Sequence, residues 1–243
     1  IQGIAEFIPV SSSSHLIIMS DLLEFSEADL TIDVSLHIGS FIAVITYFRK
    51  DLIDYIKNKD LFLKIIFSSI PIMVVGYLLV KLEIIYQLRN LEIIGWTTII
   101  FGIFLFISDK FKIEKNIEKD FSFKSALIIG FFQILSLIPG VSRSGITISS
   151  SRLLNFSRYD SAKISFLLSI PTLAAVSIFG LKEITDMEKL NFTFLNILSI
   201  FLSFIFSFIT IKYFLKYVKK FSLNLFVVYR LILGAIILVV AYL

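Results

Sequence analysis

Runs of about twenty consecutive apolar residues set the strongest limit on how this chain folds. A helix of roughly 20 residues crosses the hydrocarbon core of a bilayer, and such runs lie at 32–48, 61–80, 91–108, 159–180, 193–211 and 223–243. Hydrophobic residues make up 57% of the 243 residues, mean hydropathy is +0.90 and only 17% are charged, against about 25% in soluble domains. The sequence therefore predicts an all-α, polytopic integral membrane protein with about six full spans.

Two further apolar stretches, 1–20 and 123–150, are interrupted by proline, glycine and clusters of hydroxyl residues. Irregular backbone at membrane depth is stable only where protein or a water-filled cavity surrounds it. We therefore expect both stretches to be broken, re-entrant helical segments. The alternative is a pair of loops at the membrane interface.

The charged loops predict the orientation of the chain, because cytoplasmic loops of membrane proteins carry an excess of lysine and arginine. The basic segments, expected on the cytoplasmic side, are 49–64, 110–124 and 212–220. The segments expected outside are 21–29, which is acidic, and 81–92 and 182–189, which are mixed.

With these orientations, the chain repeats one unit with opposite topology. A re-entrant segment followed by three spans occupies 1–122, and the same order occupies 123–243. The sequence thus predicts two inverted repeats within one membrane domain. Identical residues recur at offsets of 130 to 132, as Gln2/Gln133, Pro9/Pro139, Ala43/Ala175 and Gly102/Gly234.

The second broken segment has the composition of a phosphate site. An arginine at membrane depth costs at least about 2.5–3.5 kcal/mol unless it is paired or faces water, yet Arg143 stands between Ser142 and Ser144. Nearby glycines allow backbone N–H groups to converge on an anion, and a helix beginning here adds its positive end. Guanidinium, hydroxyl and amide donors together suit phosphate, and Thr147 is a further hydroxyl donor.

The first broken segment carries groups for acid–base and nucleophilic chemistry. Gln2 and Glu6 are four residues apart, hence on one helical face. A run of serines, Ser11 to Ser14, then leads to His15. A carboxylate, hydroxyls and an imidazole this close together point to catalysis. Taken singly, Glu6 and His15 also fit a water-facing carboxylate and an interfacial histidine.

Other observations narrow the function classes. The chain has no cysteine, which excludes disulfides and thiolate metal sites, and its net charge of +4 gives no reason to expect nucleic-acid binding. The sequence is compatible with a homo-oligomer without indicating one. It begins at Ile1 inside a motif, so further residues are expected before it. Arg230, seven residues into the last run, is expected to pair with a carboxylate or with the cytoplasmic surface.

The two broken segments resemble the signature motifs of a known family. Gln2-x-x-x-Glu6 with the following 7–15, and Pro139-Gly140-Val141-Ser142-Arg143-Ser144-x-x-Thr147, are similar to those of the bacterial undecaprenyl-diphosphate phosphatases, also called bacitracin-resistance proteins. The resemblance implies an inner-membrane enzyme with a fold of inverted repeats. It implies removal of the terminal phosphate of undecaprenyl diphosphate, a periplasmic site and a divalent cation, Mg²⁺ or Ca²⁺.

The resemblance also assigns roles. Glu6 matches the essential glutamate, proposed as base or metal contact, and Gln2 stands where many members have a second glutamate, which puts a two-carboxylate metal site in question. Ser12 and His15 match residues debated as nucleophile and acid–base partner. The phosphate-binding residues that match are Ser142, Arg143, Ser144 and Thr147. Ser14 stands where glycine is common.

Our hypothesis is that Ser12 attacks the diphosphate after activation by Glu6 or His15. Arg143 and the serine-rich loop, including Ser11 and Ser13, would hold the phosphates, since phosphoryl transfer depends mainly on charge stabilisation. Attack by His15, or by water activated by Glu6, remains an alternative. The alternative function is a transporter or flippase for an anionic lipid, because inverted repeats also suit alternating access.

Overall fold

The computed structural model describes residues 1–12, 14–15, 30–57, 59–88, 90–111, 114–186 and 193–243. These residues are predominantly helical and form no strand, with a single isolated bridge between Lys115 and Phe156. The longer helices are α3 (Leu30–Tyr47), α4 (Arg49–Lys57), α5 (Lys59–Lys81), α7 (Leu91–Asp109), α9 (Phe123–Ile134), α10 (Arg143–Leu153), α11 (Arg158–Asp186), α12 (Phe194–Val218) and α13 (Asn224–Tyr242). The short elements are α1 (Gln2–Ala5), α6 (Ile84–Gln87), α8 (Ile117–Asp120) and the 3-10 turn η1 (Leu135–Leu137).

Five of these helices, α5, α7, α11, α12 and α13, are long and apolar enough to cross a membrane. The remaining predicted span, 32–48, forms α3, whose apolar part Thr31–Tyr47 is shorter but within the range of about 17–25 residues seen for spanning helices. The all-α, polytopic membrane fold expected from the sequence is confirmed.

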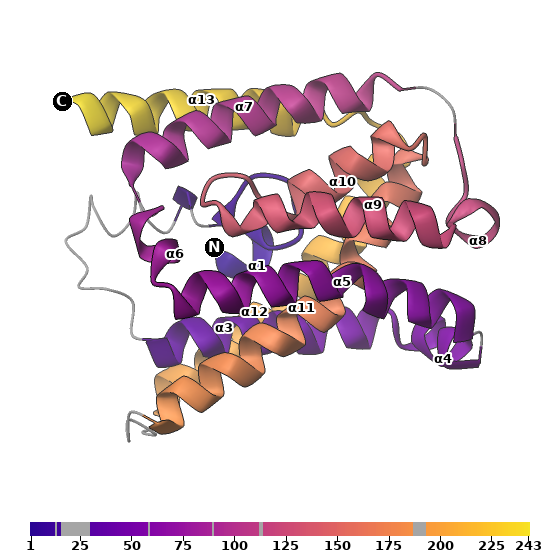
Figure 1. The fold of residues 1–243 in the computed structure, drawn as a ribbon, viewed down its shortest axis with the longest axis horizontal. Coiled ribbons are helices and arrows are strands. Elements are labelled where there is room, and N and C mark those ends of the chain that lie inside the picture. Colours follow the sequence, from indigo (N-terminus) through magenta and orange to yellow (C-terminus); the bar gives the residue numbers. More distant parts are fainter. Residues whose placement is uncertain (13, 16–29, 58, 89, 112–113, 187–192) are drawn as a thin grey trace.

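The helices of the two sequence halves are interleaved (Figure 1). Helix α3 packs against α11 and α12, and α7 packs against α13. The broken segments cross over as well, since α9 packs on α5 and α1 packs on α12. Segments from 1–122 and 123–243 therefore pack together throughout the bundle.

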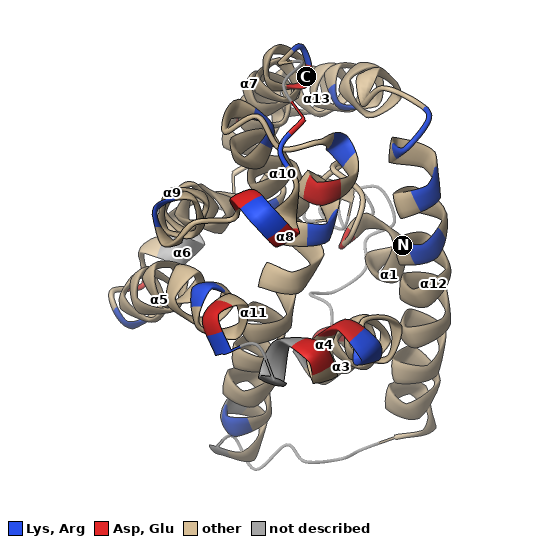
Figure 2. Cartoon of the chain, turned by 90° about the vertical axis from the view of Figure 1, so that its right-hand side faces the viewer, with Lys and Arg blue, Asp and Glu red and all other residues tan. Residues whose placement is uncertain are grey.

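Charged side chains gather at one end of the molecule, which Figure 2 shows face on. Helices α4 and α8 lie together there, because residues of both line one cavity, and a neighbouring cavity joins the end of α7 to the end of α12. The three basic segments predicted to be cytoplasmic therefore reach the same end of the helix bundle.

The second broken segment is an interior element. Its chain leaves η1, passes Gly140 and Ser142, both with positive φ (90° and 70°), and starts α10 at Arg143. Residues 144–152 of α10 are all buried, packed among α7, α9 and α11. A loop at the membrane interface would be exposed, so that alternative is wrong for this segment.

Arg230 of α13 fixes this segment from the opposite side. Its side chain is fully buried, and its guanidinium donates hydrogen bonds to the carbonyl oxygens of Gly140 (2.9 Å), Val141 (3.0 Å) and Thr98 (3.2 Å). The expectation that Arg230 pairs with a carboxylate or reaches the cytoplasmic surface is wrong. The unwound backbone leaves carbonyls without helical partners, and inside a membrane protein these need an internal donor.

Replacing Arg230 with lysine tests this clamp. A lysine ammonium does not reproduce the planar fork of the guanidinium, and each buried carbonyl left without a donor costs about 1–3 kcal/mol. We expect Arg230→Lys to lower the thermal unfolding midpoint in detergent, whereas the exposed Arg49→Lys leaves it unchanged. Equal midpoints for the two variants would contradict the clamp.

Helices α5 and α9 approach closely at Gly130. A Cβ at this position would lie 2.1 Å from the carbonyl oxygen of Ser68, whereas a Cβ at Gly76 would meet only a flexible leucine side chain at 3.4 Å. We expect Gly130→Ala to destabilise the protein by about 1–3 kcal/mol through overpacking. Gly76→Ala should be neutral or stabilising, because alanine favours helix by about 1 kcal/mol over glycine. Thermal unfolding of both variants measures the difference.

Candidate active site

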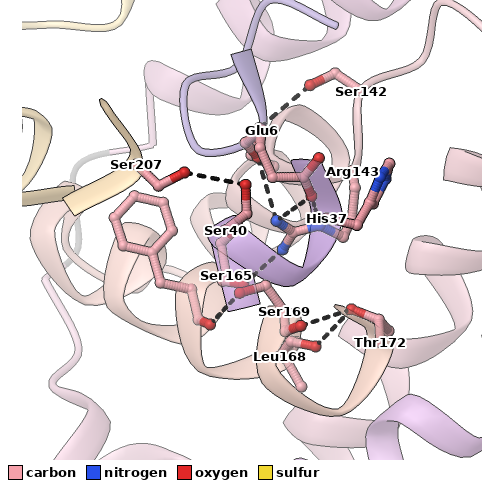
Figure 3. A network of polar contacts seen from close by, with 12 residues as sticks. Glu6, His37, Ser40, Ser142, Arg143, Ser165, Leu168, Ser169, Thr172 and Ser207 are labelled. Carbon is pink, nitrogen blue, oxygen red and sulfur yellow. Dashed lines mark hydrogen bonds and ion pairs between the residues drawn. The ribbon is translucent and has the colours of Figure 1, made fainter. Parts of the chain in front are cut away.

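An ion pair between Glu6 and Arg143 joins the two broken segments (Figure 3). Arg143 Nη2 lies 3.0 Å from Glu6 Oε1, and Nε donates to the same oxygen at 3.3 Å. The guanidinium also donates to the carbonyl oxygens of Glu6 (3.2 Å) and Ser165 (3.0 Å). The Arg143 and Glu6 side chains are only 12% and 11% exposed, so each charge is stabilised mainly by the other, and the carbonyls further stabilise the guanidinium.

Gln2 extends this network along the α1 segment. Its Nε2 donates to Glu6 Oε2 (2.9 Å) and lies 3.4 Å from Nε2 of His37. Nδ1 of His37 lies 2.9 Å from the carbonyl of Asp33. A carbonyl only accepts, so His37 carries its proton on Nδ1 and accepts from Gln2 on Nε2. Gln2 Oε1 is buried and has no hydrogen-bond partner among the described residues.

The start of α10 supplies hydroxyl and amide donors beside the ion pair. Ser142 caps this helix by accepting from the N–H of Gly145 (3.2 Å), and its hydroxyl lies 3.2 Å from that of Ser144. Ser144 donates to the carbonyl of Ile8 (2.8 Å), which links the two broken segments a second time. Thr147 donates to the hydroxyl of Ser165 (2.7 Å). The positive end of an eleven-residue helix thus lies at Arg143.

A second hydrogen-bonded group surrounds His15. Its Nδ1 donates to the carbonyl of Ser11 (2.6 Å), so Nε2 accepts from the hydroxyl of Tyr229 (2.5 Å), whose ring lies parallel to the imidazole. Ser14 bridges Ser11 (3.1 Å) and Thr98 of α7 (3.0 Å) through its hydroxyl. This group holds the loop after Pro9 in place.

The structure thus brings most of the predicted site residues into two networks. Ser12 is partly exposed and makes no side-chain hydrogen bond within the described part of the chain, so none joins it to Glu6 or His15. Ser13 lies outside the described residues. The first network holds Gln2, Glu6, Ser142, Arg143, Ser144 and Thr147, and the second holds Ser11, Ser14 and His15.

Four residues of these networks were not among the predicted site residues: Ser165, Thr98, Tyr229 and His37. Ser165 and Thr98 are single hydroxyl residues in apolar helices, where such residues usually bond to their own backbone or across helices. Only the folded structure reveals their role, because each hydroxyl bonds to a residue of a broken segment that is distant in the sequence.

The predicted cation site has few candidate ligands. No group of three or more His, Asp or Glu side chains placed to hold a metal occurs among the described residues. The Glu6 carboxylate and Gln2 Oε1, which has no hydrogen-bond partner among the described residues, nevertheless both offer oxygen atoms that can coordinate a metal ion. Mg²⁺ is commonly held by one or two carboxylates together with substrate phosphates, so these residues fit a cation that the substrate helps to bind.

Known proteins similar to this chain identify its family. The family described as bacitracin resistance protein BacA matches residues 1–236. An undecaprenyl-diphosphatase of Pelagibacter ubique is 49% identical over 243 residues, which are 100% of this chain and 94% of that protein. Undecaprenyl-diphosphatases of Jannaschia sp. and Aliivibrio salmonicida are 36% and 39% identical, covering 100% and 98% of this chain and 96% and 94% of those proteins. The chain therefore belongs to the BacA family of bacitracin resistance proteins.

Proposed function

We propose that this protein hydrolyses undecaprenyl diphosphate to undecaprenyl phosphate and inorganic phosphate, which recycles the lipid carrier for cell-wall synthesis. The observation that carries this function is the Glu6–Arg143 pair beside the start of α10. It combines a carboxylate with cationic and hydroxyl donors inside a membrane protein. The undecaprenyl-diphosphatase activity named for the relatives supports the same substrate.

Substrate binding changes the partners of Arg143. A diphosphate carries several negative charges, and guanidinium groups bind phosphate oxygens through paired hydrogen bonds. The phosphates compete with Glu6 for Arg143, and Ser144 and the amides at the start of α10 add further donors. Glu6 is then released from the Arg143 guanidinium and becomes available as a proton acceptor. The closed ion pair therefore represents the resting state.

Ser12 is the nucleophile in this proposal. Its Oγ attacks the terminal phosphorus while Glu6 accepts the hydroxyl proton, and the bond from phosphorus to the bridging oxygen breaks, releasing undecaprenyl phosphate. Water then hydrolyses the phosphoserine and releases phosphate. Glu6 is favoured over His15 as the base, because phosphate binding frees Glu6 Oε1 from Arg143, whereas both ring nitrogens of His15 stay engaged by Ser11 and Tyr229.

A divalent cation, Mg²⁺ or Ca²⁺, completes the site. Glu6 and the unpartnered oxygen of Gln2 would hold it. When bound, it neutralises charge on the phosphate oxygens.

The site faces the periplasm in the bacterial inner membrane. This orientation rests on the gathering of the basic segments at one end of the molecule (Figure 2), which the positive-inside rule places in the cytoplasm. Phosphate then leaves through the opposite side.

Phosphate release from detergent-solubilised protein tests the function. We expect Arg143→Ala and Glu6→Gln each to lower kcat at least about 100-fold, the usual effect of removing one transition-state donor or base. The exposed Lys212→Ala is the matched control for loss of a cation and should retain full activity. No release by the wild type, with flux of the lipid across liposomes, would instead establish the transporter.

The nucleophile is identified by single-turnover trapping with substrate labelled in its terminal phosphate. We expect acid-stable label on a peptide containing Ser12, and none in Ser12→Ala. Acid-labile phosphohistidine at His15 would overturn the role of Ser12. Full turnover by Ser12→Ala without a labelled intermediate would assign the attack to water.

A further inference from the structure

Two apolar cavities lie end to end beside the first broken segment. One, of about 400 Å³, lies between α1 and α13 and is lined by Ile4, Ile8, His15, Phe226 and Tyr229 among others. The next, of about 660 Å³, lies against α12 and is lined by Ile209, Tyr213 and Tyr217 together with the same Ile8 and Phe226. Because two residues border both cavities, together they form one groove, called here the α12–α13 groove.

The α12–α13 groove opens sideways toward lipid. Helix α12 packs on α1, α3 and α11, whereas α13 packs on α7; α1 lies beside α12 (Figure 2). Most side chains that line the groove are apolar or aromatic, and several are substantially exposed, including Ile4 (41%), Ile209 (45%) and Tyr213 (59%); Lys216 and Lys220 line the second cavity as well. A bilayer-embedded molecule therefore reaches the groove without crossing water.

Ile8 connects the groove to the active site. The carbonyl oxygen of Ile8 accepts a hydrogen bond from the hydroxyl of Ser144 in the phosphate-binding network. Ile8 also lines both cavities of the groove. His15 and Tyr229 lie at the other boundary between the polar site and the apolar groove. A ligand with a polar group at Ser144 and Arg143 has a continuous apolar path for the chain attached to it.

We propose that the α12–α13 groove binds the isoprenoid chain of a polyprenyl diphosphate, holding the units nearest the diphosphate. This inference rests on the proposed function and adds the place where the isoprenoid chain of the substrate is bound. The first cavity is bounded by the site, so it receives the proximal units. The second continues along α12 toward Lys216 and Lys220 at the charged end of the molecule, and the rest of the chain extends into the bilayer.

Substrates of different chain length test the groove in active protein. Phe226 borders both cavities, so Phe226→Ala removes contacts with the bound chain. We expect the KM for undecaprenyl diphosphate to rise about tenfold, and the KM for dimethylallyl diphosphate to rise less, because its single isoprene unit reaches only the first cavity. Ile232→Ala is the matched control, because Ile232 is exposed on the same helix and lines neither cavity. An equal rise in KM for both substrates, or no rise in KM, would contradict binding of the isoprenoid chain in the groove.

A second variant covers the case in which Phe226→Ala fails to fold, since the Phe226 ring packs against Phe214 and Tyr217. Tyr213 is exposed and lines only the second cavity. Tyr213→Ala should therefore raise the KM for the long substrate alone.

Photo-crosslinking measures the same contact without turnover. A polyprenyl diphosphate analogue carrying a diazirine on its first isoprene units should label 209–229, and excess unlabelled undecaprenyl diphosphate should prevent the labelling. Label on α5 and α9 instead would overturn the proposal, and competition by ordinary phospholipid alone would assign the groove to an acyl chain. Hydrolysis of dimethylallyl diphosphate by the wild type tests the proposed function separately.

Discussion

The Glu6–Arg143 ion pair constrains this structure more than any other single contact. An uncompensated charge in such a buried place is costly, and breaking a buried pair by removing one partner typically costs about 3–5 kcal/mol. The pair joins residues 137 positions apart, so the two broken segments are stable only when they meet. The hydrogen bond from Ser144 to Ile8 and the clamp of Arg230 on Gly140 and Val141 then fix the depth of that meeting point.

The two segments share a backbone design but differ in their chemistry. Ser11 and Ser142 both adopt positive φ (72° and 70°) after an Ile-Pro sequence. The first segment places a carboxylate on the helix before this turn, whereas the second places a guanidinium directly after it. The meeting of the two segments therefore sets a proton acceptor opposite an anion binder. Neither segment alone contains both functions.

Much of this was predictable from residue order, and the remainder depended on geometry. Long uninterrupted apolar runs predict spanning helices, so the fold class follows from composition. The cost of placing an arginine in the membrane singles out Arg143 as a residue that needs a partner, which favours pairing of the two broken segments. The fate of Arg230 did not follow, because the carbonyls it binds are unsatisfied only once 140–141 unwind. Ser165 and Thr98 were equally hidden, since their partners lie in distant parts of the chain.

A phosphatase acting on a membrane lipid must solvate a diphosphate and an apolar chain at neighbouring points. Broken helices meet the first need, because their free N–H groups and Arg143 replace water around the phosphates. The α12–α13 groove meets the second, because apolar and aromatic residues of α1, α12 and α13 line its two cavities. Ile8 belongs to both the polar site and the apolar groove. Its carbonyl oxygen accepts from Ser144 in the site, and the residue lines the cavities of the groove. A short re-entrant helix achieves this division where a full span would close the groove.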